Sequence, residues 1–241
     1  MITKNQIKLI KSLTLKKNRI QSGFFIAEGE KIVDELIESD LETVNIFSIS
    51  EKYKNLKNYI SINSTQLKQI SNLKSPNNVL GIFKIPMNQE IDFKANIVAL
   101  EDINDPGNLG TIIRLCDWFG IKNIICSKNS VDCYNPKVVQ SSMGSISRVS
   151  ISYMEFYNLI SSYNYKTVAA DLNGKNIKDY LFSDNQIIFF GSESNGFSQK
   201  LSSKIKNKIT IERYNNNVES LNLASSVAIV LSELNNQITG K

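Results

Sequence analysis

Residues 96–120, NIVALEDINDPGNLGTIIRLCDWFG, decide the fold of this chain. The apolar run over 96–103 predicts a strand, and the turn over 105–108 predicts a sharp change of direction. An apolar stripe with helical spacing follows, made of Leu109, Ile112, Ile113 and Cys116. Gly120 ends that helix. A strand that passes through a short turn into a helix is the building unit of a parallel α/β sheet.

The same alternation continues along the chain in both directions. After residue 120, strands are expected over 123–127, 167–171, 187–192 and 208–212, and helices near 136–145, 155–162, 198–206 and 219–235. Before residue 96, helices are expected over 4–18, 28–38 and 65–73, and strands over 44–49 and 78–85. The polar, proline-bearing stretch 85–96 is the expected linker. We therefore expect an α/β protein with a largely parallel sheet and two domains, 1–90 and 91–241.

The composition excludes several kinds of chemistry. Of the 241 residues, 41% are hydrophobic, which is enough to form a core. Histidine is absent, so Ser-His-Asp or Cys-His catalysis, an imidazole base and histidine-bearing zinc sites are excluded. Cys116, Cys126 and Cys133 are an odd number without a C-x-x-C pair, so we expect reduced, buried thiols in a cytoplasmic protein, with no metal. No run of about 20 apolar residues predicts a membrane span.

The first 20 residues are strongly basic. The net charge of the whole chain is +5, and this segment has six cations and no acid. The cations are Lys4, Lys8, Lys11, Lys16, Lys17 and Arg19. Such an arm can neutralise nucleic-acid phosphates. The alternative is the solvated face of an amphipathic helix whose other face carries Ile7, Ile10 and Leu13.

Three clusters of glycine and polar residues follow apolar segments. In the first, Asn108 occupies the expected N-cap of the helix, and Arg114 lies off its apolar stripe, where its side chain can reach back over the helix mouth. The alternative is a simple cap with a surface pair between Arg114 and Asp117. The second cluster, Gly191-x-Glu193-x-x-Gly196, is either a ligand-binding strand end or an ordinary loop.

The third cluster, Ser220-Leu221-Asn222, enters the last helix and is on its own typical of a cap. The residues alone favour a doubly wound fold with a nucleotide bound at the carboxyl ends of the strands. However, the chain has neither G-x-G-x-x-G nor GK[ST], so a nucleotide-dependent small-molecule enzyme lacks its usual phosphate loop.

Taken together and in this order, the clusters resemble the motifs of the SpoU (TrmH) family of RNA ribose 2′-O-methyltransferases, in the SPOUT class. The motif N-x-G-x-x-x-R is similar to Asn108, Gly110 and Arg114; a strand followed by G-x-E-x-x-G to Gly191, Glu193 and Gly196; and S-L-N to Ser220, Leu221 and Asn222. The stretch 135–144, NPKVVQSSMG, also resembles the family between its first and second motifs, and FFIAEGEKIVDELIE resembles a substrate-binding domain found in front of many members.

The resemblance implies a fold and a cofactor. It implies a trefoil-knotted C-terminal domain with a parallel sheet, preceded by a small α/β, ribosomal-protein-like domain that binds RNA. It implies S-adenosylmethionine in the knot, with cofactor contacts at Gly191, Ile211, Leu221 and Ala170. It also implies a homodimer with the active site at the subunit interface. One departure is Glu212, which stands where members usually carry proline, so we expect a different pocket shape around 211–218.

The resemblance implies methyl transfer to a ribose 2′-hydroxyl, of ribosomal RNA first and transfer RNA as the alternative. The catalytic set is then Arg114, Asn108, Glu193, Ser220 and Asn222. The family arginine is proposed as the base, yet a guanidinium stays protonated in proteins. Arg114 is better suited to pair with phosphate and to stabilise charge on the 2′ oxygen, and Glu193 is the one carboxylate of the three motifs that can accept a proton. The alternative from another class is a non-catalytic RNA-binding protein on the same scaffold.

Overall fold

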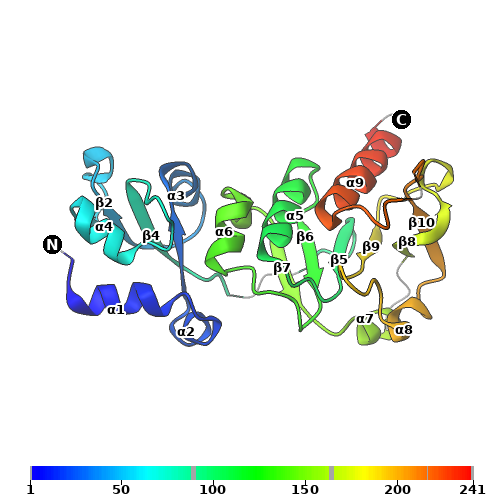
Figure 1. The fold of residues 1–241 in the computed structure, drawn as a ribbon, viewed down its shortest axis with the longest axis horizontal. Coiled ribbons are helices and arrows are strands. Elements are labelled where there is room, and N and C mark those ends of the chain that lie inside the picture. The colour runs from blue at the N-terminus through cyan, green and yellow to red at the C-terminus, as the bar shows by residue number, and fades with distance from the viewer. Residues whose placement is uncertain (1, 88–90, 163–165, 216, 240–241) are drawn as a thin grey trace. The chain divides into compact units, whose positions relative to one another are not determined.

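The computed structural model describes residues 2–87, 91–162, 166–215 and 217–239 (Figure 1). The chain forms two compact units. Unit 1 comprises Met1–Asn88 and Asp132–Arg148, and unit 2 comprises Gln89–Val131 and Val149–Lys241. The expected linker contains the junction at 88–89, but residues 88–90 lie outside the described part of the chain. The domain boundary near residue 90 stays a prediction, and unit 1 additionally includes a segment from the middle of the chain.

Unit 1 is built on a four-stranded sheet with the order β1-β4-β2-β3. Its strands are β1 (Phe24–Glu28), β2 (Thr43–Ser48), β3 (Tyr59–Ser61) and β4 (Val79–Lys84). Its helices are α1 (Lys4–Ser12), α2 (Lys16–Ser22), α3 (Glu30–Ile37), α4 (Ser64–Ile70) and α6 (Pro136–Ser142), with short 3-10 turns at Glu51–Tyr53 and Ser145–Ser147. Strand β4 is antiparallel to both β1 and β2, whereas β2 and β3 are parallel.

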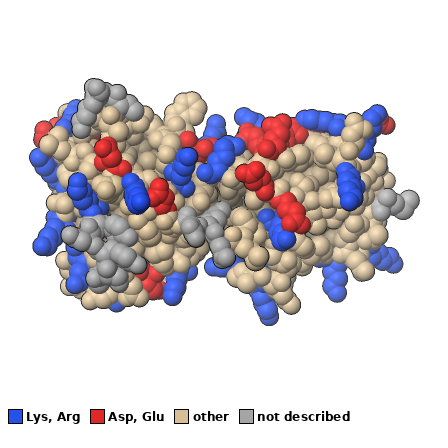
Figure 2. Space-filling model, turned by 180° about the vertical axis from the view of Figure 1, so that it is seen from behind, with Lys and Arg blue, Asp and Glu red and all other residues tan. Residues whose placement is uncertain are grey.

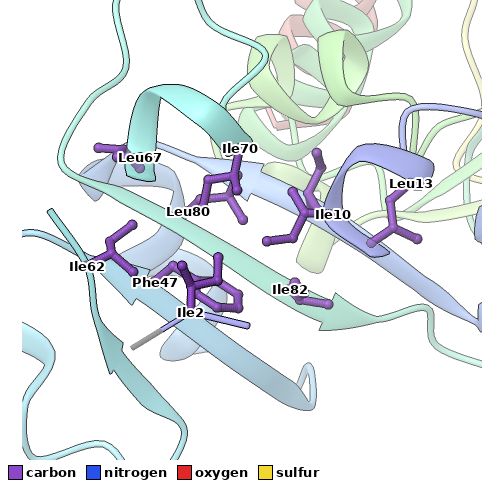
Figure 3. Close-up of a cluster of buried hydrophobic side chains, with 10 residues drawn as sticks. Ile2, Ile10, Leu13, Phe47, Ile62, Leu67, Ile70, Leu80 and Ile82 are labelled. Atoms are coloured by element: carbon purple, nitrogen blue, oxygen red, sulfur yellow. The ribbon is translucent and has the colours of Figure 1, made fainter. Parts of the chain in front are cut away.

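The hydrophobic core of unit 1 joins α1, α4 and one face of the sheet (Figure 3). Side chains from these elements point toward one another in the close-up, and Ile10, Leu13, Phe47, Leu80 and Ile82 are fully buried. Burial of each such side chain contributes roughly 1.5–3 kcal/mol before the conformational entropy is subtracted. The alternating apolar residues that predicted these elements therefore also define the core.

The single helix expected over 4–18 is wrong, because the structure has two helices with a break at 13–15. The Arg19 guanidinium donates to the carbonyl oxygens of Leu13 and Thr14 at 2.7 and 2.9 Å. The Asn18 side-chain amide donates to the carbonyl of Ser12 at 2.9 Å. Carbonyl groups that the break leaves without helical partners are thus satisfied by side chains of α2.

Arg19 also corrects the prediction of a basic arm. Its side chain is 2% exposed and forms an ion pair with Asp132, with a distance of 2.9 Å from Nε to the carboxylate. Asp132 begins the segment 132–148, which also carries α6 against β1 and a ring contact between Tyr134 and Phe25. Arg148, at the end of this segment, pairs with Glu35 at 3.0 Å. Arg19 therefore holds unit 1 together and is not available to RNA.

Unit 2 is a six-stranded sheet with the order β10-β8-β9-β5-β6-β7, and every neighbouring pair is parallel. Its strands are β5 (Ile97–Leu100), β6 (Asn123–Cys126), β7 (Ser150–Tyr153), β8 (Lys166–Asn176), β9 (Gln186–Phe190) and β10 (Asn207–Thr210). Its helices are α5 (Pro106–Trp118), α7 (Phe156–Ser162), α8 (Gln199–Ser202) and α9 (Leu223–Thr239), with a 3-10 turn at Ile177–Asp179. The predicted α/β class and parallel sheet are confirmed.

Strand β8 is longer than expected because it pairs with β10 across a shift in register between Lys208 and Ile209. Gly174 makes this possible: a Cβ at this position would lie 2.4 Å from the carbonyl carbon of Ile209. Only glycine allows two backbones to approach so closely. Strand β8 thus continues past Ala170, the last residue that pairs with β9, so Asp171 and Leu172 lie beside the carboxyl end of β9.

The central strands of unit 2 are almost completely buried, as expected for a parallel sheet covered on both faces. All three cysteines are buried, as the sequence predicted. Burial raises the pKa of the Cys116 thiol, which keeps it protonated and unsuited to act as a nucleophile. In the described part of the chain, no helix is both long and apolar enough to cross a bilayer.

Candidate active site

The three polar clusters meet at the carboxyl edge of the unit 2 sheet. Asn108 lies in the first turn of α5, Glu193 follows β9, and Asn222 immediately precedes α9. The side-chain amide of Asn108 donates to Oε1 of Glu193 at 2.8 Å, and the amide of Asn222 donates to Oδ1 of Asn108 at 3.0 Å. Residues separated by 85 and 114 positions in the sequence therefore form one hydrogen-bonded chain, Asn222–Asn108–Glu193.

The capping pattern of α5 differs from the expected one. Asp105, not Asn108, is the N-cap, and its carboxylate accepts from the backbone N–H of Asn108 at 2.7 Å. Pro106 then occupies the first helical turn, where its missing N–H costs nothing. Because Asp105 performs the capping, the side chain of Asn108 is free to bond with Glu193. The simple-cap alternative for Asn108 is therefore wrong.

Asn222 combines the two roles that the sequence left open. Its Oδ1 accepts from the backbone N–H groups of Ala224 and Ser225 at 2.9 and 3.3 Å, which satisfies the start of α9. Its amide group donates in the opposite direction, to Asn108. One side chain therefore fixes the start of a helix and anchors the hydrogen-bonded chain at the same time.

The loop that carries Glu193 is closed on itself. Ser192 and Gly196 exchange backbone hydrogen bonds of 2.9 and 3.0 Å. A Cβ on Gly191 would lie 2.5 Å from the carbonyl carbon of Gly196, and Gly196 has a φ of +62°. The glycines of G-x-E-x-x-G are thus required by the turn itself, which presents the exposed carboxylate of Glu193 at its tip.

Arg114 and Ser220 do not take part in the chain of bonded side chains. Arg114 is on an exposed face of α5 and forms no hydrogen bond or ion pair with any described residue, so the alternative of a surface pair with Asp117 has no support in the described part. Ser220 is exposed as well. In a single chain, the guanidinium of Arg114 therefore faces solvent.

Beside this polar chain, a cavity of about 930 Å³ opens at the ends of β8, β9 and β10. Its wall includes all four residues expected to contact a cofactor: Ala170, Gly191, Ile211 and Leu221. It also includes Glu193, Ser220 and Asn222. The volume lies in the range of ligand sites, and the wall mixes aliphatic side chains with backbone and carboxylate groups. These features fit a nucleoside joined to an amino acid. No cluster able to hold a metal ion occurs among the described residues.

Asp171 is a wall residue that sequence reasoning missed. Its carboxylate accepts from Lys208 Nζ at 2.8 Å and from the backbone N–H of Asn173 at 3.0 Å. Burial works against ionisation here, but these hydrogen bonds hold the pKa of Asp171 below its ordinary value. An ionised carboxylate therefore lines the cavity. No local motif marks Asp171, because its partner is 37 residues away.

The loop that departs from the family pattern also lines the cavity. Tyr214 donates to the carboxylate of Glu212 at 2.8 Å, and the Arg213 guanidinium donates to the carbonyl of Val218 at 3.2 Å. The loop is therefore tied together by its own side chains, at the position where the resemblance predicts proline. Asn216 lies outside the described residues.

Comparison with known proteins finds two family models that match different parts of the chain. A model of the SpoU rRNA methylase family matches residues 95–232, and a model of the MRM3-like substrate-binding domain matches residues 4–81. A TrmH-family RNA methyltransferase structure from Porphyromonas gingivalis superimposes with a TM-score of 0.88, at 29% identity over 97% of this chain and 98% of that one. An AdoMet-bound rRNA methyltransferase from Sinorhizobium meliloti has a TM-score of 0.85 at 25% identity, with 99% and 97% coverage.

Among curated proteins, the chain is 23% identical to the 23S rRNA (guanosine(2553)-2′-O)-methyltransferase RlmP of Bacillus subtilis, over 96% of both chains. It is 26% identical to the mitochondrial rRNA methyltransferase 3 of Xenopus tropicalis, over 61% of this chain and 40% of that longer protein. The first family match covers more than half of the sequence and contains all three polar clusters. The chain belongs to the SpoU rRNA methylase family.

Proposed function

We propose that this protein transfers the methyl group of S-adenosylmethionine to a ribose 2′-hydroxyl of ribosomal RNA. The observation that carries the proposal is the hydrogen-bonded chain Asn222–Asn108–Glu193 at the edge of the cavity, since it unites the three family motifs in one site. The relative from Bacillus subtilis, whose name states this reaction, matches the chain over almost its whole length.

The cofactor is assigned to the cavity of unit 2. Ala170, Gly191, Ile211 and Leu221 would hold it, and Asp171 would add an anionic wall. When bound, S-adenosylmethionine supplies an electrophilic methyl group on a positively charged sulfur. With the cofactor bound, the aliphatic wall residues would shield this region from water, which would strengthen the electrostatic interactions of the charged side chains around it.

The catalytic roles follow from the charges at the edge. The ribose hydroxyl must lose a proton, and Glu193 is the carboxylate that can accept it. Asn108 holds Glu193 in place, and Asn222 holds Asn108. Arg114 remains protonated, pairs with a phosphate of the substrate and stabilises negative charge as it develops on the 2′ oxygen. Ser220 shapes the wall beside Asn222.

We further propose a homodimer in which α5 lies at the interface. Trp118 is 82% exposed on α5, one helical turn beyond the unpaired Arg114. An exposed tryptophan next to an unpaired arginine is typical of protein interfaces, where both residue types are enriched. A partner subunit would then complete the surroundings of Arg114. The trefoil knot, the absence of a metal and the cytoplasmic location stay predictions, as does the RNA-binding role of the N-terminal domain.

The test is methyl transfer from labelled S-adenosylmethionine to unmodified ribosomal RNA, with wild-type protein and Arg114→Ala. We expect label in an alkali-resistant dinucleotide, because a methylated 2′-hydroxyl cannot assist cleavage of the adjacent phosphodiester. We expect Arg114→Ala to lower turnover by about 100-fold or more while cofactor affinity stays near that of wild type, because removal of one stabilising donor has this effect.

The other outcomes separate the alternatives. Label in transfer RNA but not in ribosomal RNA would change the substrate and keep the reaction. Binding of both cofactor and RNA without any transfer would favour the non-catalytic RNA-binding protein. Equal loss of cofactor binding and turnover in Arg114→Ala would make Arg114 structural.

A further inference from the structure

Unit 2 carries a cluster of positive charge on one aromatic ring. The ammonium nitrogen of Lys200 lies 4.2 Å from the ring centroid of Tyr157, and that of Lys204 lies 5.3 Å from the same centroid. Tyr157 belongs to α7, and the lysines belong to α8 and the turn after it, which pack side by side (Figure 1). Both lysines are exposed and the tyrosine is 37% exposed, so the cluster is open to solvent.

No acidic side chain in the described part of the chain neutralises this cluster. Neither ammonium group forms an ion pair or hydrogen bond there. Glu155, two residues before Tyr157, pairs with Lys128 at 3.8 Å. In unit 1, by contrast, the ammonium of Lys52 over Tyr53 is bonded to Asp34. Two like charges held over one ring repel each other, so a bound anion would stabilise the arrangement.

Tyr157 and Lys200 lie on segments that leave the same edge of the sheet as the candidate active site, and Lys204 lies in the turn that leads from α8 to β10. Strand β7 leads into α7, and β9 leads through the Glu193 loop into α8. Ser198, the N-cap of α8, donates from its backbone N–H and its hydroxyl to Glu101 at 2.9 and 2.6 Å, directly after β5. This bonding anchors the segment that carries Lys200 to the strand end from which α5 and Asn108 follow.

On one face of the molecule, positive charge is dispersed. On the face in Figure 2, lysine and arginine side chains stand apart from one another and acidic side chains are interspersed. A net charge of +5 spread in this way provides little general attraction for RNA. Contacts with the RNA backbone therefore depend on local clusters of unpaired cations.

We propose that Tyr157, Lys200 and Lys204 form a phosphate-binding contact for the RNA strand whose ribose enters the active site. The proposal rests on the proposed function and adds to it the path that the strand takes over unit 2. Lys200 and Lys204 neutralise backbone phosphates, and the ring of Tyr157 holds the two ammonium groups together. Because the contact is with the backbone, it is independent of RNA sequence.

The test compares two double variants with the same change in charge. Lys200→Gln/Lys204→Gln removes the cluster, and Lys122→Gln/Lys166→Gln removes two exposed lysines outside it, before β6 and at the start of β8. Binding of a fluorescent single-stranded RNA of about 20 nucleotides is measured from low to high KCl. The slope of log K against log salt is negative, and we expect it to become shallower by about 1.4 in the cluster variant, at about 0.7 per lost phosphate contact. The matched control should keep the wild-type slope.

Variants of the ring give a second readout. Tyr157→Phe keeps a π face and should bind RNA like the wild type, whereas Tyr157→Leu should weaken binding a fewfold. An unchanged slope in the lysine variant, or an equal decrease in the matched control, would overturn the proposal. Methyl transfer by the wild type is measured separately. If no methyl group is transferred but the salt slopes of the two lysine variants are as expected, the proposed function is rejected and the phosphate contact is retained.

Discussion

The two units differ in how they use an arginine side chain. Arg19 in unit 1 is almost completely buried, paired with Asp132 and bonded to two backbone carbonyls. Arg114 in unit 2 is exposed and has no partner among the described residues. The same side chain therefore holds a fold together in one unit and remains available to a substrate in the other.

The two arginines differ because their guanidinium groups have different hydrogen-bond acceptors within reach. A buried guanidinium is stable only where acceptors satisfy its donors, and Asp132, Leu13 and Thr14 provide them for Arg19. An exposed guanidinium needs no such partners and can bind a phosphate of the substrate. The presence of an arginine in the sequence therefore does not tell whether it binds RNA or stabilises the fold.

The largest effect is expected when the buried pair is broken. Arg19→Met would leave the carboxylate of Asp132 without its cation and should lower the stability of unit 1 by about 3–5 kcal/mol. Unfolding in urea is the measurement, with Lys17→Met on the same helix as the exposed control, expected within about 0.5 kcal/mol of wild type. Thiol labelling can locate the change: Cys133 of unit 1 should react before the buried Cys116 of unit 2.

An Arg19→Met protein as stable in urea as the wild type would mean that the pair contributes nothing net. In that case the double variant Arg19→Met/Asp132→Leu should also equal the wild type. If the pair stabilises through its mutual satisfaction, the double variant should recover part of the loss, since no unpaired charge remains buried.

A smaller effect is expected at the hydrogen-bonded chain of unit 2. Asn108→Asp replaces the donor to Glu193 by a second carboxylate, and the like charges should raise the pKa of the pair. The base form of Glu193 is then reached only at higher pH, so the acidic limb of the pH–rate profile should move upward, and turnover at neutral pH should fall about tenfold or more. The comparison variant Asn108→Ser removes the donor without adding charge.

Asn108→Ser should therefore lose turnover with little displacement of the acidic limb. If both variants shift the limb equally, the charge on residue 108 is irrelevant. Glu193 would then not be the group whose ionisation controls the rate. Cofactor affinity, measured in parallel, should remain close to wild type in both variants.

The smallest effect is expected from the exposed lysines of unit 1. Lys8, Lys11 and Lys17 are exposed, unlike Arg19. Reversal of these three charges to Glu should weaken RNA binding about fivefold or more at moderate salt and reduce its salt dependence, because each lost phosphate contact lowers the slope. Stability should hardly change. An unaltered slope would identify α1 and α2 as a solvated face that does not contact RNA.

Local patterns predicted most of the elements, and the errors have identifiable causes. Strands β1, β3 and β7, of three to five residues, were not among the expected elements. The helix over 4–18 was expected to be continuous because its apolar spacing is continuous. Its break depends on bonds from Arg19 and Asn18, which no local pattern contains.

The candidate site was predictable as a set of residues but not as an arrangement. Asn108, Glu193 and Asn222 each looked like a cap or loop residue on its own, and only their order along the chain suggested a common site. That Asp105 takes over the capping of α5, so that Asn108 can bond with Glu193, required coordinates. Asp171 was missed for the same reason, because its Lys208 partner is distant in the sequence.

The amino-acid sequence by itself determined the α/β class, the parallel character of the unit 2 sheet, the burial of the thiols and the exclusion of histidine chemistry. These properties depend on composition and on spacings of a few residues, so they can be predicted from short stretches of sequence. Only the tertiary structure decided which arginine is buried, which helix start is a site, and that residues 132–148 belong with unit 1. Such outcomes depend on partners more than 80 positions away, and the free energy of a polar side chain is set by the partner that folding brings to it.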